Sequence, residues 1–197
     1  MVISLNDYAL SVQRAVVNFR CLDDNGVFLE WERAFDRIIQ VLTKTKANGK
    51  KLLFIGNGGS ATIASHMAED FSKVAGIRAI AFNDGALLTC LANDYSFAEC
   101  FEKAIEIYGD YDDVLFAVSS SGKSPNILKG AEAAKKKNCF VITLSGFNRN
   151  NPLLRLGGVN VHVPSHSYGI VENSHALIIH YLLDYVSGKL TDTLIRF

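Results

Sequence analysis

One short segment of the chain gathers four serine hydroxyls around a glycine, an arrangement that suits a phosphate ester. Residues 119–124 read SSSGKS, and Pro125 follows at a position typical of the first turn of a helix. Hydroxyl donors, free backbone N–H groups and the positive end of that helix would together bind a phosphomonoester. A helix cap without a ligand would need one serine instead of four. The sequence therefore predicts a phosphate site at Ser119, Ser120, Ser121 and Ser124.

A second loop, residues 56–60 with the sequence GNGGS, would let the backbone approach a ligand closely. With Gly56, Gly58 and Ala61 it satisfies the dinucleotide fingerprint G-x-G-x-x-A, and Asp84 stands where a ribose-binding acid would lie. A long helical segment precedes this loop, however, and the Ser60 hydroxyl suits a small phosphate or a sugar equally well. We therefore favour a small ligand and keep a nicotinamide cofactor as the weaker alternative.

The serine loop also fits a relaxed nucleotide-binding P-loop, because residues 117–124 read AVSSSGKS with Ala117 in place of the first glycine. A nucleotide-hydrolysing site further needs an acid at the end of a neighbouring strand to hold magnesium. The next two apolar runs end at Ser145 and at Pro164, so neither supplies such an acid. The pattern argues against hydrolysis of nucleoside triphosphates.

Carboxylates and imidazoles recur at helical spacing in two other segments. His66 and Asp70 are four residues apart and so share one helix face, where they could bind a metal or a substrate together. Exposed pairs of this kind are more often simply solvated. Near the C-terminus, Glu172 and His180 lie in an otherwise apolar helical segment, in which polar groups need partners.

The other histidines receive structural interpretations. His175 lies in the same apolar segment, and we expect it to be a buried histidine with its hydrogen bonds satisfied. His162 and His166 are interpreted as ordinary residues of a strand end and a loop.

The elements that must position these groups alternate between short apolar runs and amphipathic segments. Five runs are predicted to be strands, namely residues 51–55, 77–82, 113–118, 139–144 and 159–163. Helices are predicted at residues 5–19, 27–47, 61–74, 85–93, 97–107, 124–136 and 170–186. This alternation is typical of a parallel sheet that helices cover on both faces. Polar loops 56–60, 83–84 and 119–124 then follow strand ends, where such sheets bind ligands.

Length, charge and composition limit the class of protein. The chain has 197 residues, which suits one α/β domain with helical additions, and 20 basic residues balance 20 acidic ones. Sequence-independent binding to nucleic acid or to an anionic membrane is therefore not expected. The apolar runs are too short to span a membrane, and no leader pattern precedes them. The four cysteines form no zinc or disulfide motif, so we expect reduced thiols in a cytoplasmic protein.

Taken together, these motifs resemble the sugar isomerase (SIS) family, and most closely the bacterial phosphoheptose isomerases. The resemblance rests on the glycine loop, the helix with His66 and Asp70, residues 92–95 (ANDY), the serine loop and residues 172–180. It implies an α/β fold with a flavodoxin-like SIS domain over residues 1–197. The expected parts are a five-stranded parallel sheet flanked by helices in a core at 49–197, and N-terminal helices at 1–48 used for oligomerisation.

The resemblance also implies an activity and an assembly. The expected reaction is aldose–ketose isomerisation of D-sedoheptulose 7-phosphate to D-glycero-D-manno-heptose 7-phosphate through an enediol. Its product would supply heptose for lipopolysaccharide or capsule. The expected assembly is a homotetramer with active sites at subunit interfaces, which binds a phosphorylated sugar and neither nucleic acid nor membrane directly.

The resemblance also implies roles for individual residues of this chain, by their positions in the family's motifs. The implied substrate-binding residues are Asn57, Gly58, Gly59, Ser60, Asp94, Ser119, Ser120, Ser121, Ser124 and Glu172. His66, Asp70, Glu172 and His180 fall where the family places zinc ligands and catalytic groups, which implies one zinc ion per subunit. Isomerisation through an enediol needs a carboxylate base that moves a proton between the two carbons. It also needs a second acid/base that moves protons on the two oxygens. Asp70 is the candidate base and His180 the candidate partner.

Helical geometry adds a constraint to that ligand set. Glu172 and His180 are eight residues apart, which is about 12 Å along one helix. Two residues this far apart on one helix of a single chain are poorly placed to ligate the same ion. A site completed by a neighbouring subunit is the simpler arrangement.

Three positions depart from the family's pattern. Asp70 stands where the family has glutamate, and a carboxylate withdrawn by one methylene can lower a rate about 10²-fold. Glu172 stands where the family usually has glutamine, and residues 169–171 (GIV) replace a usual aspartate or arginine. These departures favour an alternative, a non-catalytic SIS-domain regulator similar to the replication-initiator-associating protein, which binds a sugar phosphate and a protein partner. That relative lacks a histidine at the place of His180, so this residue favours the isomerase.

Overall fold

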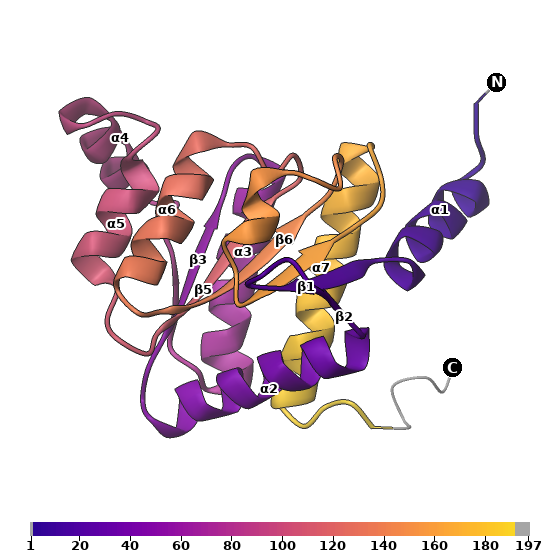
Figure 1. The fold of residues 1–197 in the computed structure, drawn as a ribbon, viewed down its shortest axis with the longest axis horizontal. Coiled ribbons are helices and arrows are strands. Elements are labelled where there is room, and N and C mark those ends of the chain that lie inside the picture. The colour runs from indigo at the N-terminus through magenta and orange to yellow at the C-terminus, as the bar shows by residue number, and fades with distance from the viewer. Residues whose placement is uncertain (1, 192–197) are drawn as a thin grey trace.

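A seven-stranded sheet forms the centre of the computed structural model, which describes residues 2–191 (Figure 1). Its strand order is β2-β1-β7-β6-β5-β3-β4. The five predicted strands are confirmed as β3 (Leu52–Gly56), β4 (Ala79–Ala81), β5 (Val114–Ser119), β6 (Phe140–Ser145) and β7 (Val159–His162). Neighbours among these five pair in parallel, as their continuously apolar sequences predict.

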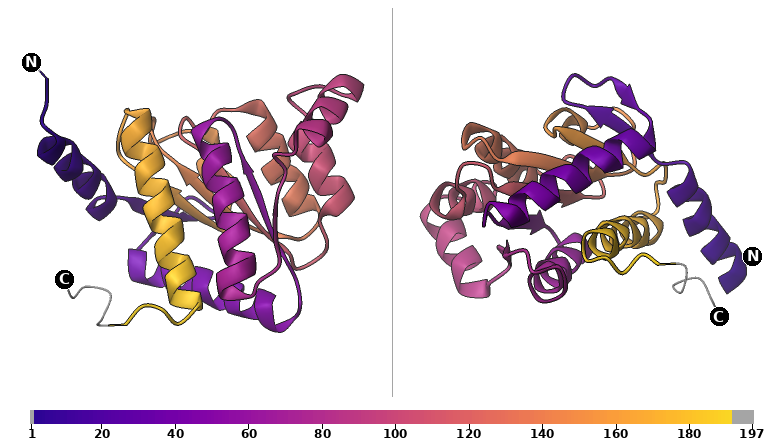
Figure 2. Two further views of the ribbon diagram at one scale, coloured as in Figure 1. Left: turned by 180° about the vertical axis from the view of Figure 1, so that it is seen from behind. Right: turned by 90° about the horizontal axis from the view of Figure 1, so that it is seen from below.

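Helices cover both faces of the sheet and make it a three-layer structure (Figure 2). On one face, Phe54 and Phe116 stack and pack with α2, α3 and α7. On the other face, Leu53 and Leu115 pack with α5 and α6, because alternate residues of a strand point to opposite sides. The helices are α2 (Trp31–Ala47), α3 (Gly59–Asp70), α4 (Gly85–Asp94), α5 (Cys100–Tyr108), α6 (Pro125–Lys136) and α7 (Tyr168–Val186). A π-helical turn, η1 (Phe71–Ala75), extends α3, and a short 3-10 helix, η2 (Pro152–Arg155), precedes β7.

The predicted helix at residues 27–47 is wrong at its start, because a β-hairpin at residues 20–29 occupies the gap between the two predicted helices and the first residues of the second. Helix α1 (Leu5–Val17) and helix α2 are separated by β1 (Arg20–Asp23) and β2 (Phe28–Leu29). The Asp23 carboxylate accepts hydrogen bonds from the backbone N–H groups of Asn25 and Val27, and Gly26 has φ +76°. This turn chemistry overrides the helical spacing of the apolar residues, and β1 pairs antiparallel with β7. The sheet therefore has seven strands, not five.

Helix α1 lies apart from the rest of the molecule in Figure 1 and contacts mainly α7. It exposes Leu5, Leu10 and Val17. The use of residues 1–48 in self-association stays a prediction. All four cysteines are free thiols, and none of the helices in residues 2–191 is long and apolar enough to cross a membrane.

His175 is fully buried in α7, as the sequence predicts. Its Nε2 lies 3.1 Å from the carbonyl oxygen of Ser145, whereas Nδ1 has no partner among the described residues. Burial lowers the pKa of His175 from 6.5 to about 4, because the charged ring would lose its hydration. The imidazole is therefore neutral at neutral pH.

This buried histidine should make the fold sensitive to acid. Between pH 6.5 and about 4 the unfolded chain binds a proton at His175 that the folded chain excludes, so the free energy of unfolding falls as the pH falls. The loss amounts to at most about 3 kcal/mol. Urea unfolding at pH 7.5 and pH 4.5 should show a smaller pH dependence for His175→Gln than for the wild type. The exposed His166→Gln is the control, and an unchanged dependence in His175→Gln would contradict the prediction.

Candidate active site

The glycine and serine loops meet at the point where the strand order reverses. Strand β3 lies between β4 on one side and β5 on the other. After β3 the chain crosses to β4, whereas after β5 it crosses in the opposite direction to β6. Residues 57–58 follow β3 and residues 120–124 follow β5 at the same edge of the sheet. Open parallel sheets bind ligands in the crevice at such a point. The structure thus brings the two predicted loops together.

The glycine loop has a backbone that only glycine can adopt. Gly58 caps α3 with φ +55° and ψ −124°, a region that residues with a side chain rarely occupy. A Cβ on Gly56 would collide with the carbonyl group of Ser60. The turn therefore places the backbone N–H groups at the start of α3, next to the buried Ser60.

The serine loop leaves one buried hydroxyl without a partner among the described residues. Ser124 caps α6, but its side chain accepts no hydrogen bond from the helix backbone and lies 3.5 Å from the Ser119 hydroxyl instead. The hydroxyl of Ser120 is buried and has no partner among the described residues. Ser119 shapes the loop instead, since its hydroxyl accepts from the N–H of Gly122 at 3.2 Å. A buried, unpaired hydroxyl in a loop that leads into a helix N-terminus matches the predicted phosphate site.

A reciprocal pair of amides ties the two loops together. Asn57 and Asn126 each donate from Nδ2 to the Oδ1 of the other at 2.9 Å. Asn57 was a predicted site residue, but the sequence analysis missed Asn126. Asn126 is a polar residue next to Pro125 in the first turn of α6, and its burial is evident only in the structure. The pair fixes the spacing of the loops across which a phosphate would bind.

Three predicted acid/base residues converge between α3 and α7. One ligand atom from each of His66, Asp70 and His180 lies within 4.8 Å of the others. His66 Nε2 is 3.4 Å from Asp70 Oδ2, and the two imidazole rings are 5.3 Å apart at their centroids. The π-helical turn η1 begins directly after Asp70, and such turns are frequent at functional sites. We call these three residues the His–Asp–His cluster.

Two other predicted residues lie outside this cluster. The Glu172 carboxylate packs against Gly59 at the start of α3, so close that a Cβ on Gly59 would collide with it. This separation agrees with the helical distance between Glu172 and His180. Asp94 is exposed at the end of α4, where it accepts hydrogen bonds from Asn93 and Cys90. Within residues 2–191, no hydrogen bond or ion pair joins Asp94 to either loop.

The geometry does not support the two nucleotide alternatives. Asp84 uses its carboxylate to cap α4, where it accepts from the N–H of Leu87 at 2.9 Å. The strands on either side of β5 end at Gly56 and Ser145, so in the described structure neither places an acid beside the serine loop. The arrangement instead combines a serine loop that matches the predicted phosphate site with a carboxylate and two imidazoles, groups that are suited to moving protons.

A model of a known protein family matches more than half of the chain. The family model described as SIS domain matches residues 27–146. The chain belongs to the SIS domain family. The phosphoheptose isomerase of Helicobacter hepaticus is 35% identical to this SIS protein over 162 residues, covering 79% of this chain and 82% of the relative. That of Cytophaga hutchinsonii is 35% identical over 172 residues, covering 83% and 90%.

Solved structures extend the match of this SIS domain to its C-terminal helix. A phosphoheptose isomerase from Francisella tularensis superposes with a TM-score of 0.79 at 28% identity, covering 94% of this chain and 97% of that chain. Phosphoheptose isomerase GmhA from Neisseria gonorrhoeae gives the same TM-score at 26% identity, covering 92% and 97%. The likeness therefore extends over nearly the whole chain, well beyond the SIS domain model at 27–146.

Proposed function

We propose that this SIS-domain protein is a phosphoheptose isomerase that converts D-sedoheptulose 7-phosphate to D-glycero-D-manno-heptose 7-phosphate. The observation that carries the proposal is the His–Asp–His cluster, in a chain that also has a serine loop suited to a phosphate ester, with the Ser120 hydroxyl unpaired in the described structure. The names of the relatives supply the substrate class. We further propose that the enzyme works in the cytoplasm and that its product feeds lipopolysaccharide or capsule synthesis.

The direct test is aldose formation from sedoheptulose 7-phosphate. The purified protein should form the aldose in the presence of zinc, at a rate proportional to protein concentration. Binding of the sugar phosphate without turnover would overturn the proposal and would favour the non-catalytic regulator. That alternative is not favoured now, because His180 belongs to the cluster and the relatives are named as isomerases.

In the proposed mechanism two side chains share the proton transfers. The Asp70 carboxylate removes a proton from C1 of the ketose and returns it to C2. His180 moves a proton between the two oxygens, so that the C2 carbonyl becomes a hydroxyl and the C1 hydroxyl becomes a carbonyl. The proton count balances, and no other reactant is consumed. His66 lies beside Asp70 and would orient its carboxylate.

The His–Asp–His cluster also fits a zinc ion. Two imidazoles and one carboxylate are donors that zinc prefers, and all three side chains are partly or fully exposed to solvent. We propose that these residues hold one zinc ion per subunit, with Glu172 of a neighbouring subunit as a further ligand. Bound there, zinc would act as a Lewis acid on the substrate carbonyl. Each ligand would use one atom for the ion, so the second carboxylate oxygen of Asp70 and the second ring nitrogen of His180 would stay available for the proton transfers.

Zinc binding can be measured without any assay of activity. Isothermal titration should show that His66→Ala weakens zinc affinity by at least about 10-fold, because one ligand of the set is lost. His166→Ala, an exposed histidine outside the cluster, should bind zinc as the wild type does. Equal affinities in His66→Ala and the wild type would contradict the zinc proposal.

Helical spacing supports an active site completed by a neighbouring subunit. Glu172 and His180 are eight residues apart in α7, which is about 12 Å along the helix axis. The Glu172 carboxylate packs against Gly59 at the glycine loop, so within one chain it lies with that loop and not with the His–Asp–His cluster. We propose a homotetramer in which one subunit supplies the phosphate loop and its neighbour the cluster.

Mixing two inactive variants tests the shared site. His180→Ala lacks the acid/base, and Ser120→Ala/Ser121→Ala lacks two phosphate-binding hydroxyls. Mixed oligomers should recover up to about one quarter of the wild-type rate, since that fraction of the interfaces combines two intact halves. Each variant refolded alone is the control. No recovery from a verified mixed oligomer would place the whole site within one chain.

A further inference from the structure

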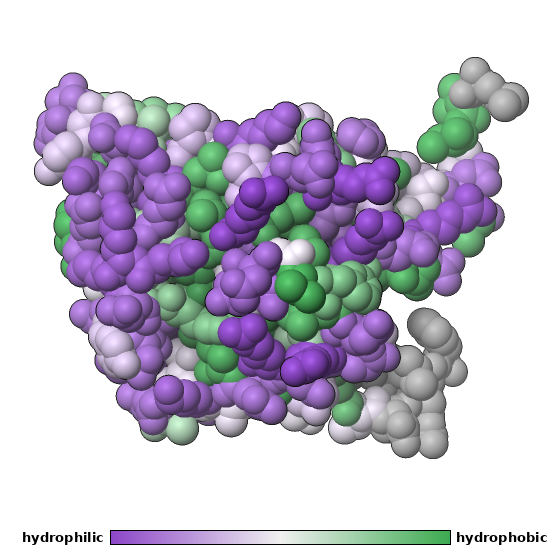
Figure 3. All heavy atoms as spheres, viewed as in Figure 1, coloured by the Kyte–Doolittle hydropathy of each residue, from purple (hydrophilic) through white to green (hydrophobic). Residues whose placement is uncertain are grey.

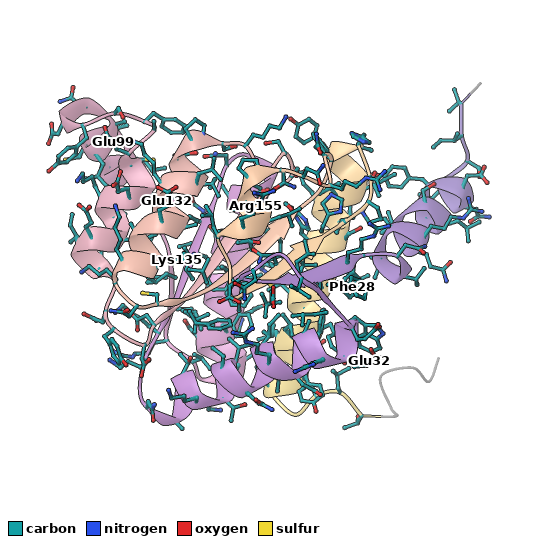
Figure 4. All side chains as sticks on the ribbon, in the orientation of Figure 1. Phe28, Glu32, Glu99, Glu132, Lys135 and Arg155 are labelled. Atoms are coloured by element: carbon teal, nitrogen blue, oxygen red, sulfur yellow. The ribbon has the colours of Figure 1, made fainter. Side chains whose placement is uncertain are left out.

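Two adjoining cavities are lined by the start of β1, the end of β7 and the loop after β6. They have volumes of about 470 and 460 Å³, and both are lined by Arg20, Arg149 and His162. Arg155 of η2 lines the larger one and is labelled in Figure 4. Figure 3 shows hydrophilic side chains over this part of the surface. We call the combined space the arginine cavity.

Long-range pairing assembles this cavity from distant parts of the sequence. Arg20 begins β1 and lies opposite His162, the last residue of β7. Arg149 and Arg155 come from the loop and short helix between β6 and β7. The cavity lies beyond β6 and β7, whereas the proposed active site lies between β3 and β5. The two sites are therefore separate within one chain.

The charges in the arginine cavity lack protein partners. Among residues 2–191, the guanidinium groups of Arg20, Arg149 and Arg155 make no ion pair or side-chain hydrogen bond. The larger cavity contains one acid, Asp24. Three arginines against one carboxylate leave a surplus of positive charge, although the whole chain has a net charge of zero. Arginine binds phosphate through two parallel N–H donors, so such a surplus favours a phosphate group.

The buried side chain of His162 adds a second, independent observation. Its Nε2 has no hydrogen-bond partner in the described structure, although the residue is only 3% exposed. Burial lowers the pKa of His162, and the positive charges of Arg20 and Arg149 lower it further. A neutral imidazole beside three arginines can form a hydrogen bond with a ligand without adding a fourth charge.

We propose that the arginine cavity binds a phosphorylated small organic molecule at a site separate from the substrate. Its volume lies in the range of small-ligand pockets and exceeds what one phosphate ion would fill. Asn151 connects the two sites, since it lines the cavity and its side chain packs against Gly122 of the serine loop. The proposal depends on this cavity alone and does not require that the chain is an isomerase.

Calorimetric titration of the full-length protein with adenosine 5′-monophosphate, pyrophosphate and inorganic phosphate tests this site. The Ser120→Ala/Ser121→Ala background removes binding at the serine loop. In that background we expect one ligand per chain, bound at least tenfold more tightly as the organic phosphate than as inorganic phosphate. Arg20→Gln/Arg149→Gln should weaken this binding at least tenfold. Arg33→Gln, an exposed arginine outside the cavity, should not change it.

Two further measurements on Arg149→Gln serve as controls, one for folding and one for catalysis. Arg149 lies on an exposed loop, so Arg149→Gln alone should keep the wild-type melting temperature and still weaken the ligand. Turnover of the sugar phosphate by Arg149→Gln should stay within twofold of the wild type if the proposed isomerase activity exists. The proposal is overturned if none of the three probes binds or if inorganic phosphate binds as tightly as the organic phosphate. Equal loss in Arg33→Gln would also overturn it.

Discussion

Replacing His180 by alanine should lower kcat for aldose formation by about 10²–10⁴-fold, the usual contribution of a general acid/base. The imidazole is partly exposed and lies within 4.8 Å of the Asp70 and His66 ligand atoms, where it can reach the two substrate oxygens. The KM should change by less than about twofold, because the serine loop binds the phosphate elsewhere. Steady-state kinetics with saturating zinc measure both constants.

The control for His180 is His166→Ala, which removes an imidazole that stacks on Phe147 outside the cluster. It should leave kcat and KM unchanged. A similar kcat in His180→Ala and the wild type would show that another group transfers the oxygen protons. A kcat loss matched by an equal loss in His166→Ala would point to a general loss of folded protein.

Asp70→Asn should also lower kcat by about 10²–10⁴-fold, because an amide cannot accept the C1 proton. The change keeps the size of the side chain and leaves a polar group beside His66. Asp70→Glu should retain far more activity than Asp70→Asn, since it keeps a carboxylate that reaches one methylene further. Stopped-time assays of aldose formation across the three proteins give the comparison.

Glu69→Gln is the matched control for Asp70. Glu69 is an exposed acid on the same helix and pairs only with Lys73, at 4.0 Å. Its loss should change kcat by less than about twofold. The double variant Asp70→Asn/His180→Ala should be little slower than the worse single variant, because residues that act as one unit are not additive. Full activity in Asp70→Asn would remove this carboxylate from the mechanism.

Local sequence patterns predicted the sheet well and the N-terminal region poorly. The central strands β3, β5 and β6 are continuous apolar runs that are buried almost throughout, so each stands out in the sequence as a short uninterrupted apolar segment. The hairpin was missed because β2 has only two residues and its apolar residues fall at helical spacing. The turn from Asp23 to Gly26 carried the signal, through an acid that accepts backbone hydrogen bonds and a glycine at positive φ.

The parts of the candidate site that were predictable from the sequence are those whose residues lie close together in the chain. Spacing alone paired His66 with Asp70, but only the family resemblance added His180, which is 110 residues further along the chain. The bond from Asn57 to Asn126 and the meeting of Arg20 with His162 depend on strand order and register. Sequence periodicity within one element cannot reveal such contacts between elements.

Hydrogen exchange during turnover tests most directly whether this chain isomerises a ketose phosphate through an enediol. Sedoheptulose 7-phosphate would be incubated with the zinc-loaded protein in D₂O and followed by proton NMR. The enediol route predicts an aldose that carries deuterium at C2, because the Asp70 base exchanges its proton with solvent. Asp70→Asn, which removes that base, should slow the exchange by about 10²–10⁴-fold. Bound ketose that keeps both C1 hydrogens and yields no aldose would contradict the assignment.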